Sequence, residues 1–200
     1  MPEKEIVKVV KMALEKMDKT YCRLSQLNYS NIDKKIKQSA KKNKYLERPI
    51  AYEFYHALRK LIDAEDVDLG ENVIQGEVDK RYQHCFKKGK IPDFLKHVPK
   101  SHDQNLAVIE FKLATNLDEL DSDLNKLVQF KRSSMLKYEY GIEVIVGDEK
   151  AIQSAKMSVE KVNSSNGEKI IIITFDIDSL KADDFSISYM PQEEADSTLE

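Results

Sequence analysis

The chain contains 200 residues, of which 41% are hydrophobic and 34% are charged, and its formal net charge at pH 7 is -3. This length and balance are typical of one globular domain with a sizeable core, and they exclude a disordered or fibrous chain. The longest strongly apolar run, residues 170–173, is far shorter than the ~20 residues that span a bilayer, and the charged N-terminus lacks a signal-peptide core, so we expect a cytoplasmic protein with no membrane partner.

The first 48 residues are predicted to form a helical extension that packs on the core. Apolar residues recur at helical spacing over residues 3–17 and define one stripe of an amphipathic helix: Ile6, Val9, Val10, Ala13, Leu14 and Met17. A lysine-rich helix is predicted over residues 32–46, since residues 34–44 hold six lysines and no acid. The apolar stripe could instead make a dimer contact, so a homodimer is an alternative expectation.

A third helix is predicted from Pro49, because proline fits the first turn of a helix. Its apolar stripe ends near Ile62, and Glu53 lies on the flank of that stripe. Tyr52 and Tyr55 could stack on a nucleic-acid base, although aromatic residues at this spacing are more often part of a core.

From residue 72 the apolar period changes to two, which predicts strands. Strands over 72–82, 91–98 and 106–113 would form a meander, with a hairpin turn at residues 87–90. A capping-box pattern at Asn116 and Glu119 predicts the start of a helix that runs toward residue 135. Strands over 141–146 and 169–176 follow, separated by a helix over 150–162.

This order of elements predicts an α/β fold, more closely described as α+β, with a mixed central sheet of about five strands flanked by helices. Residues 49–180 would form the core domain, and residues 181–200 would form an acidic C-terminal tail.

The lysines are concentrated in two segments, residues 34–44 and residues 80–102. Each has a local charge near +6, which favours contact with phosphates, although solvated helix faces and edge strands also produce such runs. The predicted nucleic-acid contacts in these segments are Lys41, Lys42, Lys87, Lys88 and Lys90.

Three charged residues interrupt the apolar runs of the second and third predicted strands. Glu110 and Lys112 are two residues apart and therefore share one face, and Asp93 can lie beside Glu110 in an antiparallel pair. Two neighbouring carboxylates repel each other unless a cation or a proton lies between them. A magnesium ion needs only one or two carboxylates besides a backbone carbonyl, waters and substrate oxygens, and Lys112 could then act on the water or on the phosphate.

The alternative interpretation of the same three residues is structural. They could lie on an edge strand with their charged groups in solvent, where a Glu-x-Lys pair contributes little. A lone tripeptide of this kind is common by chance.

The combination of Pro92-Asp93, the apolar strand that ends in Glu110-Phe111-Lys112, and the order of elements resembles the PD-(D/E)XK nuclease superfamily. This group includes type II restriction enzymes and archaeal Holliday-junction resolvases, and the likeness covers roughly residues 49–176. It extends to small uncharacterised prokaryotic members through residues 105–112 and 123–127.

The resemblance implies a restriction-endonuclease-like core and a Mg²⁺-dependent endodeoxyribonuclease, in which Mn²⁺ could replace Mg²⁺. Asp93 and Glu110 would bind the metal with the backbone carbonyl of Phe111, and Lys112 would complete the catalytic site. The additional acid that such enzymes often take from the preceding helix corresponds to Glu53.

Two further residues are weaker candidates. Glu77 could join the metal site, although an alternating polar face of the first strand explains it as well. Lys126, on the helix after the third strand, could contact a phosphate, but it could also be a solvated helix lysine. The four histidines show no paired spacing typical of a metal site.

Two functions remain open on the sequence alone. The first is a metal-dependent nuclease that acts on DNA by in-line attack of water at phosphorus. The second is a binding module for nucleic acid or protein on the same fold, since a fold does not establish an activity. Retention of Asp93, Glu110 and Lys112 together favours the nuclease.

Overall fold

A computed structural model describes residues 1–22, 45–77, 91–100 and 104–191 of the chain. Six strands form one mixed sheet in sequence order: β1 (Val73–Gly76), β2 (Phe94–His97), β3 (Asn105–Leu113), β4 (Tyr140–Gly147), β5 (Glu168–Asp176) and β6 (Lys181–Tyr189). Strands β3, β4 and β5 are parallel to one another, whereas β1, β2 and β6 join the sheet through antiparallel pairs.

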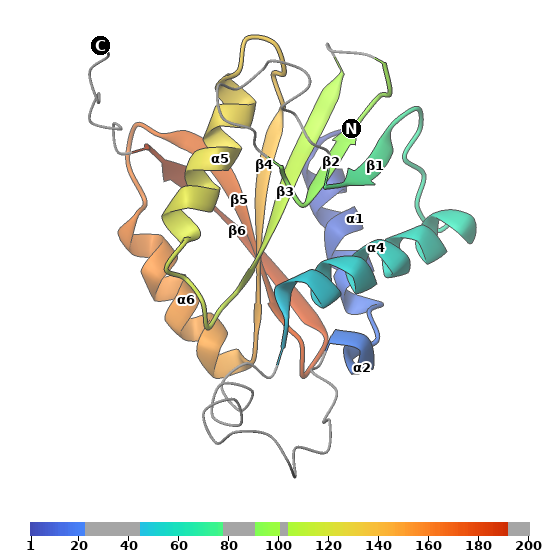
Figure 1. Ribbon diagram of the computed structural model, residues 1–200, viewed down its shortest axis with the longest axis horizontal. Coiled ribbons are helices and arrows are strands. Elements are labelled where there is room, and N and C mark those ends of the chain that lie inside the picture. The colour runs from blue at the N-terminus through green and yellow to red at the C-terminus, as the bar shows by residue number, and fades with distance from the viewer. Residues whose placement is uncertain (23–44, 78–90, 101–103, 192–200) are drawn as a thin grey trace, which may run out of the picture.

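Helices cover both faces of this sheet (Figure 1). One face packs against α1 (Glu3–Glu15) and α4 (Glu47–Asp63), with the short α2 (Lys19–Cys22) against α4. The other face packs against α5 (Leu120–Arg132) and α6 (Glu149–Lys161), which connect the parallel strands. Among the described segments, no helix combines the length and the apolar character required to cross a bilayer.

Strand β3 lies inside the sheet and is buried along almost its whole length. Its alternate side chains enter two separate apolar cores, because successive residues of a strand face opposite sides. Ile109 and Phe111 pack on the side of α1 and α4, and Val108 packs on the side of α5 and α6. Glu110 and Lys112 therefore face α5.

The sheet has one strand more than predicted. Residues 181–189, which the sequence analysis assigned to an acidic tail, form β6 and pair with β5 along nine residues. Ala182, Ile187 and Tyr189 are buried, while Asp183 and Asp184 are exposed at the edge of the sheet. These two consecutive aspartates lie on opposite faces of the strand and interrupt its apolar alternation, so the segment resembles a polar tail in the sequence.

The start of α5 also differs from the prediction. The helix begins at Leu120, and its N-cap residue is Glu119 without a side-chain capping bond, so Asn116 does not form the predicted capping box. The predicted lysine-rich helix over 32–46 lies almost entirely outside the described residues, and the hairpin turn over 87–90 lies wholly outside them.

Candidate functional site

Asp93, Glu110 and Lys112 come together at the C-terminal half of β3. The ladder between β2 and β3 begins with Phe94 opposite Ile109, so Asp93 lies next to Glu110 in the extended register. Asp93 Oδ2 accepts a hydrogen bond of 2.7 Å from the backbone N–H of Phe111. The Asp93 side chain thus pairs with a backbone N–H of β3 that has no partner in β2, which begins one residue later. This hydrogen bond fixes the Asp93 carboxylate beside β3.

Two side chains of α5 complete the contacts of Glu110 and Lys112. Lys126 Nζ donates to Glu110 Oε2 at 2.8 Å, and Lys112 Nζ lies 2.7 Å from Asp123 Oδ2. Asp123 and Lys126 are three residues apart on the helix and are themselves 3.4 Å apart. This spacing puts both residues on the face of α5 that covers the sheet.

Lys126, which we predicted as a phosphate contact, is therefore held inside the cluster by two carboxylates. Its side chain is 20% exposed, so it is neither a solvated helix lysine nor a free cation. The lysines predicted to contact phosphates in the basic segments, Lys41, Lys42, Lys87, Lys88 and Lys90, lie outside the described residues.

Lys112 is also close to two further acids. Its Nζ lies 3.5 Å from Glu119 and 3.8 Å from Glu47, and only 4% of the lysine side chain is exposed. Glu47 is the first residue of α4. Helix α4 thus contributes an acid to the cluster from the opposite face of the sheet.

That acid is not Glu53, the residue indicated by the resemblance. Glu53 Oε1 accepts from the backbone N–H of Asp18 at 3.0 Å, and Oε2 lies 3.2 Å from His56 Nδ1. These contacts place the Glu53 carboxylate beside α2, where it ties α2 to α4, instead of beside Lys112. Glu47 is the acid of α4 near Lys112, because it lies in the first turn of the helix, which begins beside the end of β3.

Glu143 is a member of the cluster that the sequence analysis did not single out. It stands opposite Glu110 in the parallel register of β3 and β4, and its side chain is fully buried. Within the described part of the chain, neither of its carboxylate oxygens has a hydrogen-bond partner, and the same is true of Glu110 Oε1. A charged residue inside the apolar run of residues 141–146 was the available signal.

The cluster contains more acids than bases. Six carboxyl groups (Glu47, Asp93, Glu110, Glu119, Asp123 and Glu143) surround the two ammonium groups of Lys112 and Lys126. Three of these acids, Glu110, Asp123 and Glu143, are buried, and an excess of carboxylates there favours uptake of protons or of a cation.

The pKa values of the acids reflect this environment. Burial raises the pKa of Glu110 to about 8, against the opposing effect of the Lys126 charge. Burial, reinforced by the charges of Asp123 and Glu110, raises the pKa of Glu143 well above its usual range. Burial also raises the pKa values of Asp93 and Glu47.

The two lysines remain protonated at neutral pH. Burial by itself would lower the pKa of Lys112, but the hydrogen bond to Asp123 and the charges of Asp123 and Glu47 raise it above the ordinary value. The pKa of Lys126 is raised in the same way, since Glu110 and Asp123 outweigh the effect of burial. These contacts favour the charged form of Lys112.

Over the described ranges, no group of three or more His, Cys, Asp or Glu side chains is arranged to hold a metal ion. Asp93 and Glu110, with the carbonyl of Phe111 between Glu110 and Lys112, form a smaller donor set. Glu110 Oε1 is buried and without a hydrogen-bond partner in the described part of the chain. Two carboxylates and a carbonyl fit Mg²⁺ or Mn²⁺, because a hard cation of this kind keeps several waters.

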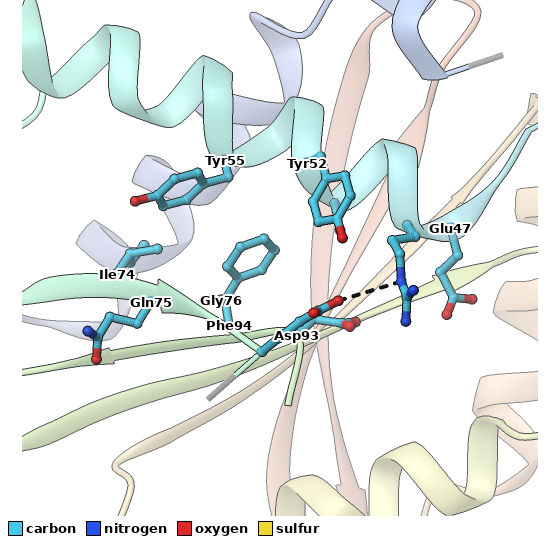
Figure 2. Close-up of a pocket in the computed structure, with 11 residues that line it drawn as sticks. Glu47, Tyr52, Tyr55, Ile74, Gln75, Gly76, Asp93 and Phe94 are labelled. Atoms are coloured by element: carbon cyan, nitrogen blue, oxygen red, sulfur yellow. Dashed lines mark ion pairs between the residues drawn. The ribbon is translucent and has the colours of Figure 1, made fainter. Parts of the chain in front are cut away.

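Glu77 lies at the edge of this region and does not join the carboxylates around Lys112. Its backbone N–H donates to the carbonyl of Asp93 at 2.9 Å, and its carboxylate lies 3.5 Å from Arg48. Both residues line a pocket that has Asp93 on one side (Figure 2). The structure therefore connects Glu77 with the pocket and with Arg48.

Comparisons of the chain with protein-family models, with curated proteins and with solved structures give no match. Function is therefore inferred from the side chains of the cluster and from the pocket beside it.

Proposed function

We propose that the chain is a Mg²⁺-dependent nuclease with a restriction-endonuclease-like core, which hydrolyses phosphodiester bonds of DNA. One observation carries this proposal: the charged groups of Asp93, Glu110 and Lys112 meet at one end of β3, in a cluster with an excess of carboxylates. Each of the three is restrained by a neighbour, namely the Phe111 N–H, Lys126 and Asp123 respectively. A preorganised set of this kind suits catalysis, which requires fixed charges.

In this proposal Asp93, Glu110 and the Phe111 carbonyl would hold the metal. A bound Mg²⁺ would supply an activated water and neutralise charge on the phosphate. Lys126 orients the Glu110 carboxylate through Oε2, which leaves Oε1 as the oxygen available to the metal. Mn²⁺ would replace Mg²⁺ at the same donors.

Lys112 acts as an electrostatic stabiliser. The Asp123 carboxylate, whose Oδ2 lies 2.7 Å from Nζ, raises the pKa of Lys112 against the effect of burial, and this favours a charge-stabilising role over that of a general base. Its ammonium instead offsets the negative charge that gathers on the phosphate oxygens in the transition state. Asp123 is a positioning residue that directs this ammonium.

The direct test is cleavage of plasmid and single-stranded DNA with Mg²⁺ by the wild type and by the Lys112→Ala and Asp93→Asn variants. We expect each variant to lose about 100-fold or more in rate, because each removes a fixed charge from the site. Lys161→Ala, which removes an exposed lysine of α6, is the matched control and keeps the wild-type rate. Unchanged cleavage by Lys112→Ala would contradict the mechanism.

A second candidate is a binding module without catalysis. The observation that favours it is that Lys112 and Lys126 are already engaged by carboxylates, as in a purely structural polar network. Calorimetric titration of the folded protein with Mg²⁺ or Mn²⁺ separates the two functions. Binding that is abolished by Asp93→Asn supports the nuclease, and the absence of any binding supports the module.

A further inference from the structure

The pocket beside Asp93 has an aromatic wall that the metal site does not use. Tyr52 and Tyr55 lie three residues apart on α4 and therefore on one face of the helix, and both line the pocket (Figure 2). Tyr52 is 57% exposed and Tyr55 is 37% exposed, so large parts of both rings remain available. The pocket has a volume of about 470 Å³, which lies in the range of small-ligand sites.

The aromatic wall is anchored in the core. Tyr55 stacks on Phe94 with ring centroids 5.9 Å apart and planes only 10° apart. Phe94 in turn packs against Phe54 and against Phe111, the residue between Glu110 and Lys112 on β3. The position of Tyr55 is thus fixed relative to the strand that carries the candidate active site.

The rim of the pocket is mainly acidic. Glu47, Glu77 and Asp93 line it, and Arg48 is the single basic side chain among its lining residues, which all belong to the described part of the chain. Arg48 is itself 3.5 Å from Glu77. This lining disfavours a free anion, but it accepts a neutral planar group that lies flat on an aromatic ring.

We propose that the pocket binds an unpaired nucleobase of the nucleic-acid substrate, stacked on Tyr52 and Tyr55. The inference rests on the proposed nuclease function, and it adds that the substrate presents a single-stranded, frayed or flipped-out base. A base inside a duplex has both faces covered by its neighbours, so it has no free face for the tyrosines. Asp93 lines the pocket and is also one of the proposed metal donors, so a base in the pocket would place the phosphates of the same strand near the cluster.

The test is binding without cleavage. A short single-stranded oligodeoxynucleotide that carries a fluorescent adenine analogue is titrated with protein in the presence of EDTA, and the same strand in a duplex is titrated in parallel. We expect Tyr52→Ala to weaken binding of the single strand by about 5- to 150-fold, the range for loss of one base–aromatic stack, and to leave duplex binding unchanged. Tyr52→Phe keeps the ring and restores the affinity.

Tyr21→Ala is the matched control, because Tyr21 is a tyrosine of α2 that is 67% exposed and does not line the pocket. Equal weakening by Tyr21→Ala and Tyr52→Ala, or an equal loss for duplex and single strand, would overturn the base pocket. The base pocket would also be overturned if Tyr52→Ala bound the single strand as tightly as the wild type does.

The base pocket and the nuclease can fail separately. If cleavage depends on Lys112 but Tyr52→Ala binds the single strand normally, the base pocket is wrong and the nuclease function stands. If binding depends on Tyr52 but the protein does not cleave DNA, the base pocket is supported and the nuclease function is wrong.

Discussion

The two glutamates that face each other across β3 and β4 are unfavourably placed on electrostatic grounds. Glu110 and Glu143 are buried side by side, and only Glu110 has a hydrogen-bonded cation, Lys126, within the described residues. An unpaired carboxylate in such a place takes up a proton, because burial disfavours its charged form. Glu143 is therefore a group whose charge works against folding.

This leads to a prediction on stability and pH for metal-free protein. The unfolded chain releases the Glu143 proton near pH 4.5, whereas the folded chain keeps it to a much higher pH, so stability falls as pH rises between these two values. Glu143→Gln removes this titration. The difference in unfolding free energy between the variant and wild type should shift in favour of the variant by up to about 1.4 kcal/mol per pH unit above pH ~5.

Urea unfolding in EDTA at several pH values measures this difference. Glu160→Gln, a change of an exposed glutamate on α6, is the control and should follow the wild-type pH dependence. If Glu143→Gln also shows the wild-type slope, the buried carboxyl group does not titrate as described.

Helix α4 carries two acids with different surroundings, one near the candidate site and one that holds the helix against the segment before α2. Glu47 reaches Lys112 from the first turn, while Glu53, more than one turn later, accepts from Asp18 of the chain that leads into α2. The two acids should thus respond differently to removal. Their sequence contexts do not reveal this division, because it depends on where the helix begins relative to β3.

We expect Glu47→Ala to weaken Mg²⁺ binding and cleavage with little change in stability, since its carboxylate acts on the charge of the cluster. Glu53→Ala should instead lower the unfolding free energy by about 1 kcal/mol through loss of its hydrogen bond and leave Mg²⁺ affinity unchanged. Calorimetry and urea unfolding of both variants provide the measurements. The opposite pattern would restore Glu53 as the acid of the site.

Strand β6 is the second element with a testable role. Its buried side includes Ile187 and Tyr189, which pack in the core below α5 and α6. Ile187→Ala should lower the unfolding free energy by about 2–5 kcal/mol, because it leaves a cavity in that core. The neighbouring Ser186→Ala, at an exposed position, should have almost no effect on the unfolding free energy. Equal effects of the two changes would indicate that residues 181–189 do not pack against the core.

Periodicity was enough to predict helices at α1, α4 and α6 and strands at β3, β4 and β5. The strict alternation of β3 also placed Glu110 and Lys112 on one face, and pairing of β2 with β3 brought Asp93 beside them. These relations are local or involve neighbouring strands, so a sequence can carry them.

The remaining members of the cluster depend on tertiary packing. Asp123 and Lys126 belong to the site because they lie on the face of α5 that packs against β3. Glu119, which was predicted to take part in a capping box, instead lies 3.5 Å from Lys112. Edge strand β6 was missed because Asp183 and Asp184, which lie on opposite faces of the strand, interrupt its apolar alternation. Glu143, in contrast, could have been found from the same logic as Glu110, since it interrupts an apolar strand.

The charge of the assembled cluster gives the last prediction. In the proposed function, the six carboxyl groups around the two ammonium groups bind Mg²⁺ in the folded chain and not in the unfolded one, and such a ligand raises the unfolding midpoint by mass action. At about one hundred times its dissociation constant, Mg²⁺ should add about 2.7 kcal/mol to the unfolding free energy relative to protein in EDTA at equal ionic strength. Thermal unfolding of Asp93→Asn should show a much smaller effect, because a proposed metal donor is lost. Asp183→Asn removes the same charge from an exposed position on β6 and should keep the full effect, so an equal loss in both variants would mean that Mg²⁺ acts on the overall charge of the protein and not at Asp93.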